Sequence, residues 1–426
     1  MVNIESVSIR GFKPHESTEL PAKNINILTG KNNVGKTSVL EAINLAFQPT
    51  NIRKYEENTD TLVNVNSSDA QISCKVSGSA GQPDLSDYTN LSKEYSVTIR
   101  NPSNQETLKI FQELIHRAVM NISFEYPNET IDAENIRPYK NILSNTAQKK
   151  ISQEESKENL TQYYESIVIL ERDDKTIPFI YLSDQYTELI DDIASATVSQ
   201  IEAHEDVSED EMNELSWLIN RQMGSLVIGR YGKSNFLGNL NDHNGAKLIS
   251  SLDITNKNIE SVENYSVVLS EIEDDLRDYN IIQDLYDFSL DNLVFETDTG
   301  RYQLPYESMG DGFKAITGLL WELEITDREN QILLLEEPEN HMHPGYIQKL
   351  VEFIIKIAQE EDIQFFITTH NIDLIDEFLD PARSEAEKYL SESLQVIQMG
   401  KYTSQVMDLE KARTQFEELH LDLRGE

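Results

Sequence analysis

The chain carries Gly30-Lys31-Asn32-Asn33-Val34-Gly35-Lys36-Thr37, a stretch that matches the phosphate-binding pattern G-x-x-x-x-G-K-[ST] at every fixed position. An apolar run at 24–29 predicts a short buried strand entering this loop, and apolar residues at helical spacing over 37–47 predict a helix leaving it. The backbone amides of such a loop and of the helix N-terminus converge on one point. The stretch therefore predicts a site for the phosphates of a nucleotide.

Each residue type in this loop has a physical task. Glycines let the backbone curl around an anion. Lys36 is expected to reach the β and γ phosphates, and the Thr37 hydroxyl is expected to ligate Mg²⁺. The residues predicted to bind the nucleotide here are Gly30, Asn32, Asn33, Val34, Gly35, Lys36, Thr37 and Ser38.

A second motif is the apolar run 331–335, which ends abruptly in the paired carboxylates Glu336 and Glu337. This pattern is typical of a buried parallel strand whose carboxyl end meets a ligand. Next to a phosphate-binding loop, Glu336 is expected to steady Mg²⁺, and Glu337 to orient and polarise the attacking water. The alternative is a strand end that stops in solvent.

The histidines need separate interpretations. A buried strand predicted at 363–367 ends in Thr368-Thr369-His370, and His370 is a candidate hydrogen-bond donor to the γ-phosphate. Its alternative role is a capped surface histidine ahead of a helix. His341 and His343 lack a convincing third ligand nearby, so a structural turn is favoured over a metal site.

A third cluster, Glu307-Ser308-Met309-Gly310-Asp311-Gly312, precedes a helix predicted to reach residue 323. Serine and glycines ahead of a helix form an anion site. Such clusters are also ordinary turns and caps. The candidate binding residues here are Ser308, Gly310, Asp311 and Gly312.

Composition limits the class of protein. The single cysteine, Cys74, excludes a disulfide within the chain, and no apolar run approaches the ~18 residues of a membrane span. Residues 1–12 alternate apolar and polar residues as a strand does, and a secretory signal does not have this pattern. A cytoplasmic location is therefore expected.

The charge is strongly acidic and uneven. The formal net charge of −39 argues against a generic basic surface for nucleic acid. Residues 1–60 hold seven bases and seven acids, whereas 151–300 hold nine bases and thirty-two acids, a net of −23. This acidity is either a solvated surface or a docking face for a basic partner.

The pattern along the chain predicts an α/β fold with a mixed sheet and flanking helices, interrupted by a mainly helical insertion. Three ranges are expected: an N-terminal half of the nucleotide domain at 1–110, an acidic insertion for dimerisation or partner binding at 111–284, and a C-terminal half at 285–426. Two apolar runs within 165–182, separated by charged residues, predict a hairpin inside the insertion.

The order of these motifs resembles that of the ABC-type P-loop ATPases of the SMC/RecF/OLD group, closest to the bacterial OLD-like AAA ATPases. The opening Ile9-Arg10-Gly11-Phe12 and the run from Gly30 to Ile43 carry the resemblance, together with Glu336-Glu337-Pro338-Glu339 and Thr369-His370-Asn371. The matches cover roughly 1–50 and 290–426. Two departures are a glutamate, Glu336, in place of the Mg²⁺-binding aspartate, and a signature that is not Leu-Ser-Gly-Gly-Gln.

The resemblance implies ATP and Mg²⁺ as cofactors and a head-to-tail ATP-sandwich homodimer, or a higher oligomer. Ser308 and Gly310 would then act on the ATP of the other chain. Lys36, Glu337 and His370 would be the catalytic residues, and Thr37 and Glu336 would hold the metal. The glutamine loop is not placed; Gln71 and Gln82 are candidates. The chain is expected to lack the Toprim nuclease domain of OLD nucleases.

The expected function is therefore an ATP-hydrolysing dimeric switch, the sensor or regulator of an anti-phage defence system with a separately encoded nuclease or toxin as effector. One alternative is a RecF/SMC-like DNA-binding ATPase in repair, and another is a scaffold that binds nucleotide without turnover.

Overall fold

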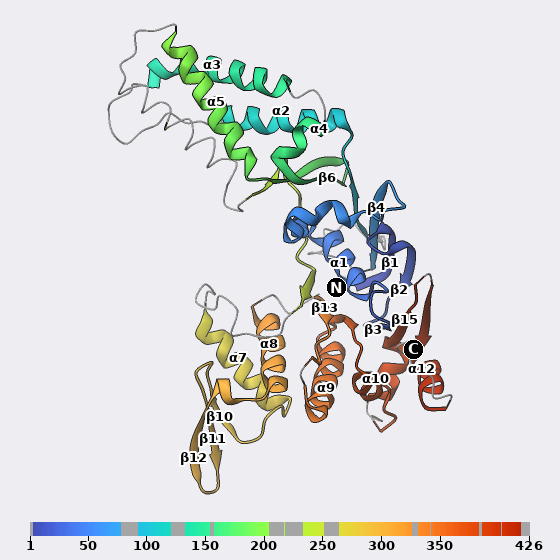
Figure 1. The fold of residues 1–426 in the computed structure, drawn as a ribbon. Coiled ribbons are helices and arrows are strands. Elements are labelled where there is room, and N and C mark those ends of the chain that lie inside the picture. Colours follow the sequence, from blue (N-terminus) through green and yellow to red (C-terminus); the bar gives the residue numbers. More distant parts are fainter. Residues whose placement is uncertain are drawn as a thin grey trace, which may run out of the picture. The chain divides into compact units, whose positions relative to one another are not determined.

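A computed structural model describes residues 3–77, 93–120, 133–153, 157–203, 217, 233–250, 264–325, 331–340, 342–382, 386–401 and 403–418 (Figure 1). The chain divides into two compact units. Unit 1 consists of Met1–Gln48, Ile72–Ser96 and Asp242–Glu426, and unit 2 of Pro49–Gln71 and Val97–Asn241. These units describe packing; the functional domains predicted at 1–110, 111–284 and 285–426 stay a prediction.

The centre of unit 1 is a six-stranded sheet with the order β16-β15-β3-β14-β13-β9. Its strands are β3 (Ile25–Gly30), β9 (Ala246–Ile249), β13 (Ile332–Glu336), β14 (Gln364–Thr368), β15 (Leu394–Met399) and β16 (Ser404–Asp408). All neighbours pair in parallel except β15 and β16, which are antiparallel. The sheet is therefore mixed, as predicted.

The register of this sheet brings three strand ends together. Thr368 of β14 lies between Leu28 of β3 and Glu336 of β13. Because parallel strands have their carboxyl ends at one edge, the loops after β3, β13 and β14 all leave the sheet at that edge. The strands predicted at 24–29, 331–335 and 363–367 are confirmed, and the topology joins segments more than 300 residues apart.

Helices flank the sheet of unit 1, as Figure 1 shows for α9 and α10. The helices of unit 1 are α1 (Lys36–Phe47), α7 (Tyr265–Asp278), α8 (Asp311–Glu324), α9 (Pro344–Glu360), α10 (Ile372–Leu379), α11 (Glu387–Ser393) and α12 (Leu409–Arg413), the last followed by a π-helical turn, Thr414–Glu418. The apolar stripes of all these helices except α1 pack with the strands into one buried core. This architecture confirms the predicted α/β P-loop fold class.

Unit 1 also contains shorter antiparallel pieces. Strands β1 (Asn3–Phe12) and β2 (His15–Pro21) form a hairpin. In the same sheet β4 (Asp69–Ser77) lies beside β1 and β5 (Lys93–Arg100) beside β4; residues 93–96 of β5 belong to unit 1 and residues 97–100 to unit 2. A separate sheet of β10 (Leu285–Phe288), β11 (Asn292–Thr297) and β12 (Gly300–Pro305) precedes the 3-10 turn Tyr306–Ser308. The strands β10 and β12 were not expected from the sequence.

Unit 2 is built from helices around a small antiparallel sheet. Its helices are α2 (Asn104–Met120), α3 (Ala133–Ser152), α4 (Lys157–Leu160) and α5 (Gln185–Glu202), with 3-10 segments at Pro49–Leu62 and Thr161–Tyr163. Within this unit β5 pairs with β6 (Tyr164–Arg172), then follow β7 (Lys175–Leu182) and β8 (Ser234–Phe236). The hairpin predicted at 165–182 is confirmed as β6 and β7.

Among the described residues, no helix is both long enough and apolar enough to cross a membrane.

Candidate functional site

The phosphate-binding loop follows β3 and has the backbone that its glycines allow. Gly30 has a φ of +140° and Gly35 a φ of +99°. A Cβ atom on Gly30 would lie 2.3 Å from the carbonyl oxygen of Met399, so only glycine fits there. Gly35 is the N-cap of α1 and no side chain caps this helix. The first-turn amides of α1 are thus left for an anion.

Lys36, the first residue of α1, lies across the loop. Its ammonium donates to the carbonyl oxygens of Gly30 and Lys31, both at 2.9 Å. Burial lowers the pKa of Lys36, and the negative charge of Glu337 opposes that shift. The loop therefore holds a cation at its centre that can turn toward a phosphate.

Thr37 and Glu336 connect α1 to the end of β13. The Thr37 hydroxyl donates to Oε1 of Glu336 at 2.8 Å. A hydroxyl and a carboxylate are hard oxygen donors of the kind that Mg²⁺ prefers, and Mg²⁺ usually completes its shell with phosphate oxygens and water. The pair fits the metal position predicted from the sequence, although its role as a metal site stays a prediction.

Glu337 and His370 connect the ends of β13 and β14. Nε2 of His370 lies 3.1 Å from Oε1 of Glu337, and its Nδ1 lies 3.5 Å from the Lys36 ammonium. Asn340 donates its side-chain amide to Oε2 of Glu337 at 3.1 Å. Glu337 has a φ of +44°, and its backbone N–H donates to the Thr368 carbonyl oxygen at 3.0 Å. Glu337 is thus held in a left-handed turn that non-glycine residues rarely adopt.

The third acid of the motif, Glu339, has a structural contact that sequence reasoning missed. Its side chain is buried and accepts a hydrogen bond from the Thr369 hydroxyl. The same hydroxyl accepts from the Asn371 backbone N–H at 2.9 Å. Burial raises the pKa of Glu339 to about 7, and the bond from Thr369 opposes this shift. The sequence offered one signal for this contact: Glu339 directly follows Pro338 in a motif already assigned to the site.

The remaining predicted histidines and glutamines have other surroundings. The His343 side chain accepts from the Gly345 backbone N–H at 3.2 Å and caps α9, which confirms the structural turn. His341 lies outside the described residues. Gln71 is exposed and donates to Asp69 at 2.8 Å, and Gln82 lies outside the described residues, so the glutamine loop stays unplaced.

The segment around Ser308 is described by its own contacts. Its hydrogen bonds are local: the backbone N–H groups of Phe313 and Lys314 donate to the Gly310 carbonyl oxygen. Ser308, Gly310 and Asp311 are exposed. A Cβ atom on Gly310 would meet nothing within 4 Å, whereas one on Gly312 would lie 2.4 Å from Tyr346 of α9.

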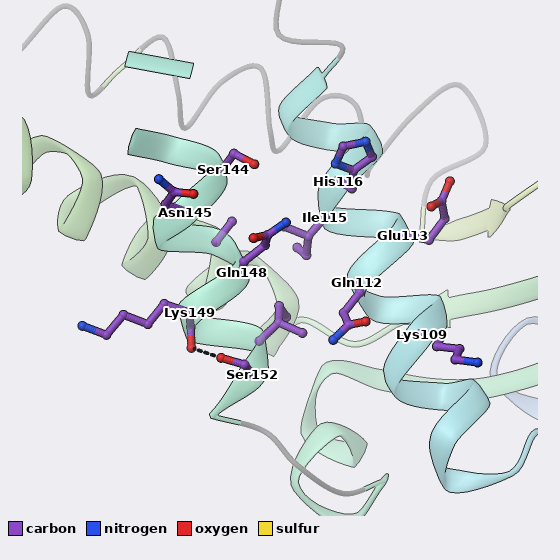
Figure 2. A pocket seen from close by; sticks show the side chains of 12 residues that line it. Lys109, Gln112, Glu113, Ile115, His116, Ser144, Asn145, Gln148, Lys149 and Ser152 are labelled. Carbon is purple, nitrogen blue, oxygen red and sulfur yellow. Dashed lines mark hydrogen bonds between the residues drawn. The ribbon is translucent and has the colours of Figure 1, made fainter. Parts of the chain in front are cut away.

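Unit 2 has a cavity of its own, of about 770 Å³, between α2 and α3 (Figure 2). Its lining combines amide, hydroxyl and apolar side chains with the charged residues Lys109, Glu113 and Lys149, and includes Gln112, Ile115, His116, Ser144 and Gln148. Figure 2 shows Gln148 of α3 reaching toward α2. Sequence reasoning gave no signal for this cavity, because it depends on how the two helices pack.

Comparisons with known proteins give one family and several partial relatives. Residues 25–376 match the family described as "AAA domain, putative AbiEii toxin, Type IV TA system". The DNA double-strand break repair Rad50 ATPase of Methanopyrus kandleri is 48% identical over 54 residues, which are 12% of this chain and 6% of that protein. The chain thus spans only a small part of this relative. An uncharacterized protein of Methanocaldococcus jannaschii is 30% identical over 121 residues, 28% of this chain and 100% of that protein.

Among solved structures, similar folds include the Smc head domain of Pyrococcus furiosus bound to the C-terminal domain of ScpA (14% identity, 99% of this chain, 100% of that chain, TM-score 0.40). Another is the SMC head domain of Thermotoga maritima (8% identity, 95% of this chain, 98% of that chain, TM-score 0.41). The family match extends over more than half of the 426 residues. The chain therefore belongs to this AAA family.

Proposed function

We propose that the chain binds ATP with Mg²⁺, hydrolyses it, and works as a nucleotide-gated dimeric switch. The observation that carries this proposal is the hydrogen-bonded group of Lys36, Thr37, Glu336, Glu337 and His370, assembled at the carboxyl edge of three parallel strands. Each residue type has a known use in phosphoryl transfer, and the fold brings them together from segments far apart in sequence.

ATP binding is assigned to the loop and to α1. The backbone amides around Gly35 and the N-terminus of α1 suit the phosphates, and the Lys36 ammonium suits the β and γ phosphates. Thr37 and Glu336 would hold Mg²⁺, which when bound neutralises phosphate charge. Asn32, Asn33, Val34 and Ser38 are further proposed contacts.

Hydrolysis is assigned to Glu337 and His370. The Glu337 carboxylate accepts a proton from, and orients, the attacking water. His370 and Asn340 each hold one of its oxygens, so the carboxylate has a fixed direction. The His370 ring lies between Glu337 and Lys36. Its Nε2–H, which faces the Glu337 carboxylate, can donate a hydrogen bond to a γ-phosphate that takes the place of that carboxylate.

Dimerisation is assigned to the exposed segment ahead of α8. Ser308, Gly310 and Asp311 are exposed at the N-terminus of α8, and a Cβ atom on Gly310 would meet nothing within 4 Å. The Ser308 hydroxyl and the backbone N–H groups of this terminus suit the phosphates of an ATP bound by a second copy, whereas the Asp311 carboxylate would not itself attract them. Gly312 is buried against Tyr346 and sets the course of this segment.

The test is sedimentation of the Glu337→Gln protein with and without MgATP, together with its turnover. We expect a monomer without nucleotide, a dimer with MgATP, and turnover far below that of the wild type. A protein that turns over ATP at the wild-type rate in this variant would refute the catalytic assignment. A protein that stays monomeric with bound ATP would refute the dimer.

The output of the switch is proposed to be a separately encoded effector, a nuclease or toxin of a defence system. The description of the matched family, which names a toxin system, supports this proposal. The cavity between α2 and α3 is the place in unit 2 where we propose that the effector docks. Gln148→Trp would place a bulky ring in the cavity from an exposed position, and should weaken co-purification of a co-expressed effector while leaving ATP turnover unchanged.

A second candidate is a DNA-binding ATPase in repair, favoured by the 48% identity to the Rad50 ATPase over 54 residues. Duplex DNA binding that requires ATP and weakens steeply with salt would support it. No binding at low salt with the dimeric Glu337→Gln protein would exclude it.

A further inference from the structure

The turn between β1 and β2 packs against the start of α1 and plays no part in the site as described above. His15, the first residue of β2, is 4% exposed. Lys13, in the turn, donates from its ammonium to Oε2 of Glu41 on α1 at 2.5 Å. The hairpin thus contacts α1 in two places, one of them through His15.

The ring nitrogens of His15 have defined partners. Nε2 lies 3.0 Å from the Gly35 carbonyl oxygen, and Nδ1 lies 3.0 Å from the Thr18 hydroxyl. A carbonyl oxygen only accepts, so Nε2 carries the hydrogen, and Nδ1 of the neutral ring accepts from Thr18. Burial lowers the pKa of His15, which keeps the ring neutral.

The carbonyl that His15 holds is the one before Lys36. It also accepts the first helical hydrogen bond, from the Val39 backbone N–H at 3.1 Å. The ring packs tightly on the glycine itself, since a Cβ atom on Gly35 would lie 2.5 Å from His15 Nε2 and 2.8 Å from Pro14. His15 therefore acts on the residue whose φ of +99° turns the chain from the loop into α1.

We propose that His15 is a positioning residue of the nucleotide site, which fixes Gly35 and thereby sets where Lys36 and Thr37 meet the phosphates. The ring is too buried to stack on a nucleotide base, so its effect passes through the Gly35 carbonyl. This inference rests on the proposed function, because it requires that the loop bind ATP. A prearranged loop binds phosphate without first ordering its backbone.

The test measures the Kd for MgATP by calorimetry, and KM and kcat by turnover, for His15→Leu and His15→Gln. Leucine fills similar space without a donor, whereas the glutamine amide can donate to the Gly35 carbonyl. We expect His15→Leu to raise Kd and KM at least about tenfold with kcat changed less, and His15→Gln to stay within about threefold of the wild type. Glu19→Gln, at an exposed position of the same hairpin, is the matched control.

The outcomes separate this inference from the proposed function. A wild-type protein that binds no ATP would refute both. A wild type that binds ATP while His15→Leu binds equally well, or while the glutamine variant loses as much as the leucine variant, would refute the role of His15 alone. If His15→Leu does not fold, His15→Phe decides: it keeps a ring of similar shape without a donor to the Gly35 carbonyl, and an unchanged Kd for MgATP would overturn the inference.

Discussion

The N-termini of α1 and α8 carry the two glycine-containing motifs of this protein, and their surroundings differ. Neither helix has a side-chain cap. At α1, Gly35 is enclosed by His15 and Pro14, and the next residue, Lys36, is 5% exposed. At α8, Gly310 has an extended backbone and open space around it. One terminus is completed by its own chain, whereas the other offers an exposed surface that a second copy could complete.

The largest effect is expected from Lys36→Ala, which removes the cation from the enclosed terminus. Charge-assisted hydrogen bonds to phosphate are strong, and the loop has no other ammonium at its centre among the described residues. We expect the Kd for MgATP to rise at least about 100-fold, measured by calorimetry. Lys75→Ala, at an exposed position of β4, is the control and should leave Kd unchanged. Unchanged binding in Lys36→Ala would disprove the assignment of the site.

Glu337→Gln separates chemistry from binding at the same terminus. The amide keeps the shape of the side chain but cannot take a proton, so we expect kcat to fall about 10²- to 10³-fold with Kd for MgATP within about threefold. Steady-state turnover and calorimetry measure the two quantities. The control is Glu360→Gln near the exposed end of α9. A rise in Kd together with the fall in kcat would instead indicate that Glu337 mainly organises the loop.

Glu339→Gln tests whether the buried Glu339 carboxyl lowers the free energy of unfolding at neutral pH. The pKa of Glu339 in the folded protein, about 7, lies above its usual value of 4.5. The folded protein therefore binds more protons than the unfolded chain between these pH values. The free energy of unfolding should fall as pH rises through this window and then level off, by up to about 3 kcal/mol from this group.

The glutamine variant removes this dependence, so above pH 7 it should be more stable than the wild type. Urea unfolding at pH 5, 6, 7 and 8 measures the difference, with Glu360→Gln as control. Two parallel pH profiles for wild type and Glu339→Gln would contradict the assignment of a raised pKa to this carboxyl.

Most of the site at the N-terminus of α1 was predictable, because the loop motif and the neighbouring strand ends each have a recognisable local sequence pattern. The loop pattern, the apolar runs before Glu336 and His370, and the rule that parallel strands end at one edge were enough to group these residues. Contacts between segments that meet only in the folded protein leave no such pattern in the sequence. The bond from His15 to Gly35 and the bond from Thr369 to Glu339 depend on packing between segments 20 and 30 residues apart.

Unit 2 was harder to predict for a related reason. Its hairpin at 165–182 has alternating strands and a charged turn, which are local signals, and it was found. Its cavity lies between α2 and α3, whose facing residues Gln112 and Gln148 look like ordinary exposed positions on amphipathic helices. Likewise, β12 has only two alternating apolar residues, Tyr302 and Leu304, and all six of its residues are exposed, so its strand signal is weak.

The smallest expected effects are on the free energy of unfolding, when Gly310 or Gly312 at the N-terminus of α8 is replaced by alanine. These two substitutions also test most directly whether that terminus is open. Gly312→Ala places a Cβ atom 2.4 Å from Tyr346, so the free energy of unfolding should fall by about 2 kcal/mol. Gly310→Ala meets nothing within 4 Å and has a φ of −66°, so stability should change by less than about 0.5 kcal/mol. Urea unfolding checks both values.

A larger side chain at Gly310 should weaken the contact between two copies of the chain without changing the folding of either copy. We expect Gly310→Leu to fold as the wild type does and to bind MgATP normally, yet to weaken the MgATP-dependent dimer about tenfold in the Glu337→Gln background, measured by sedimentation. If the dimer forms with unchanged affinity, the open space at α8 is not where a second copy binds, and the contrast between the two helix termini reflects only their folding. If Gly310→Leu instead loses ATP binding as a monomer, α8 contributes to the site of its own chain.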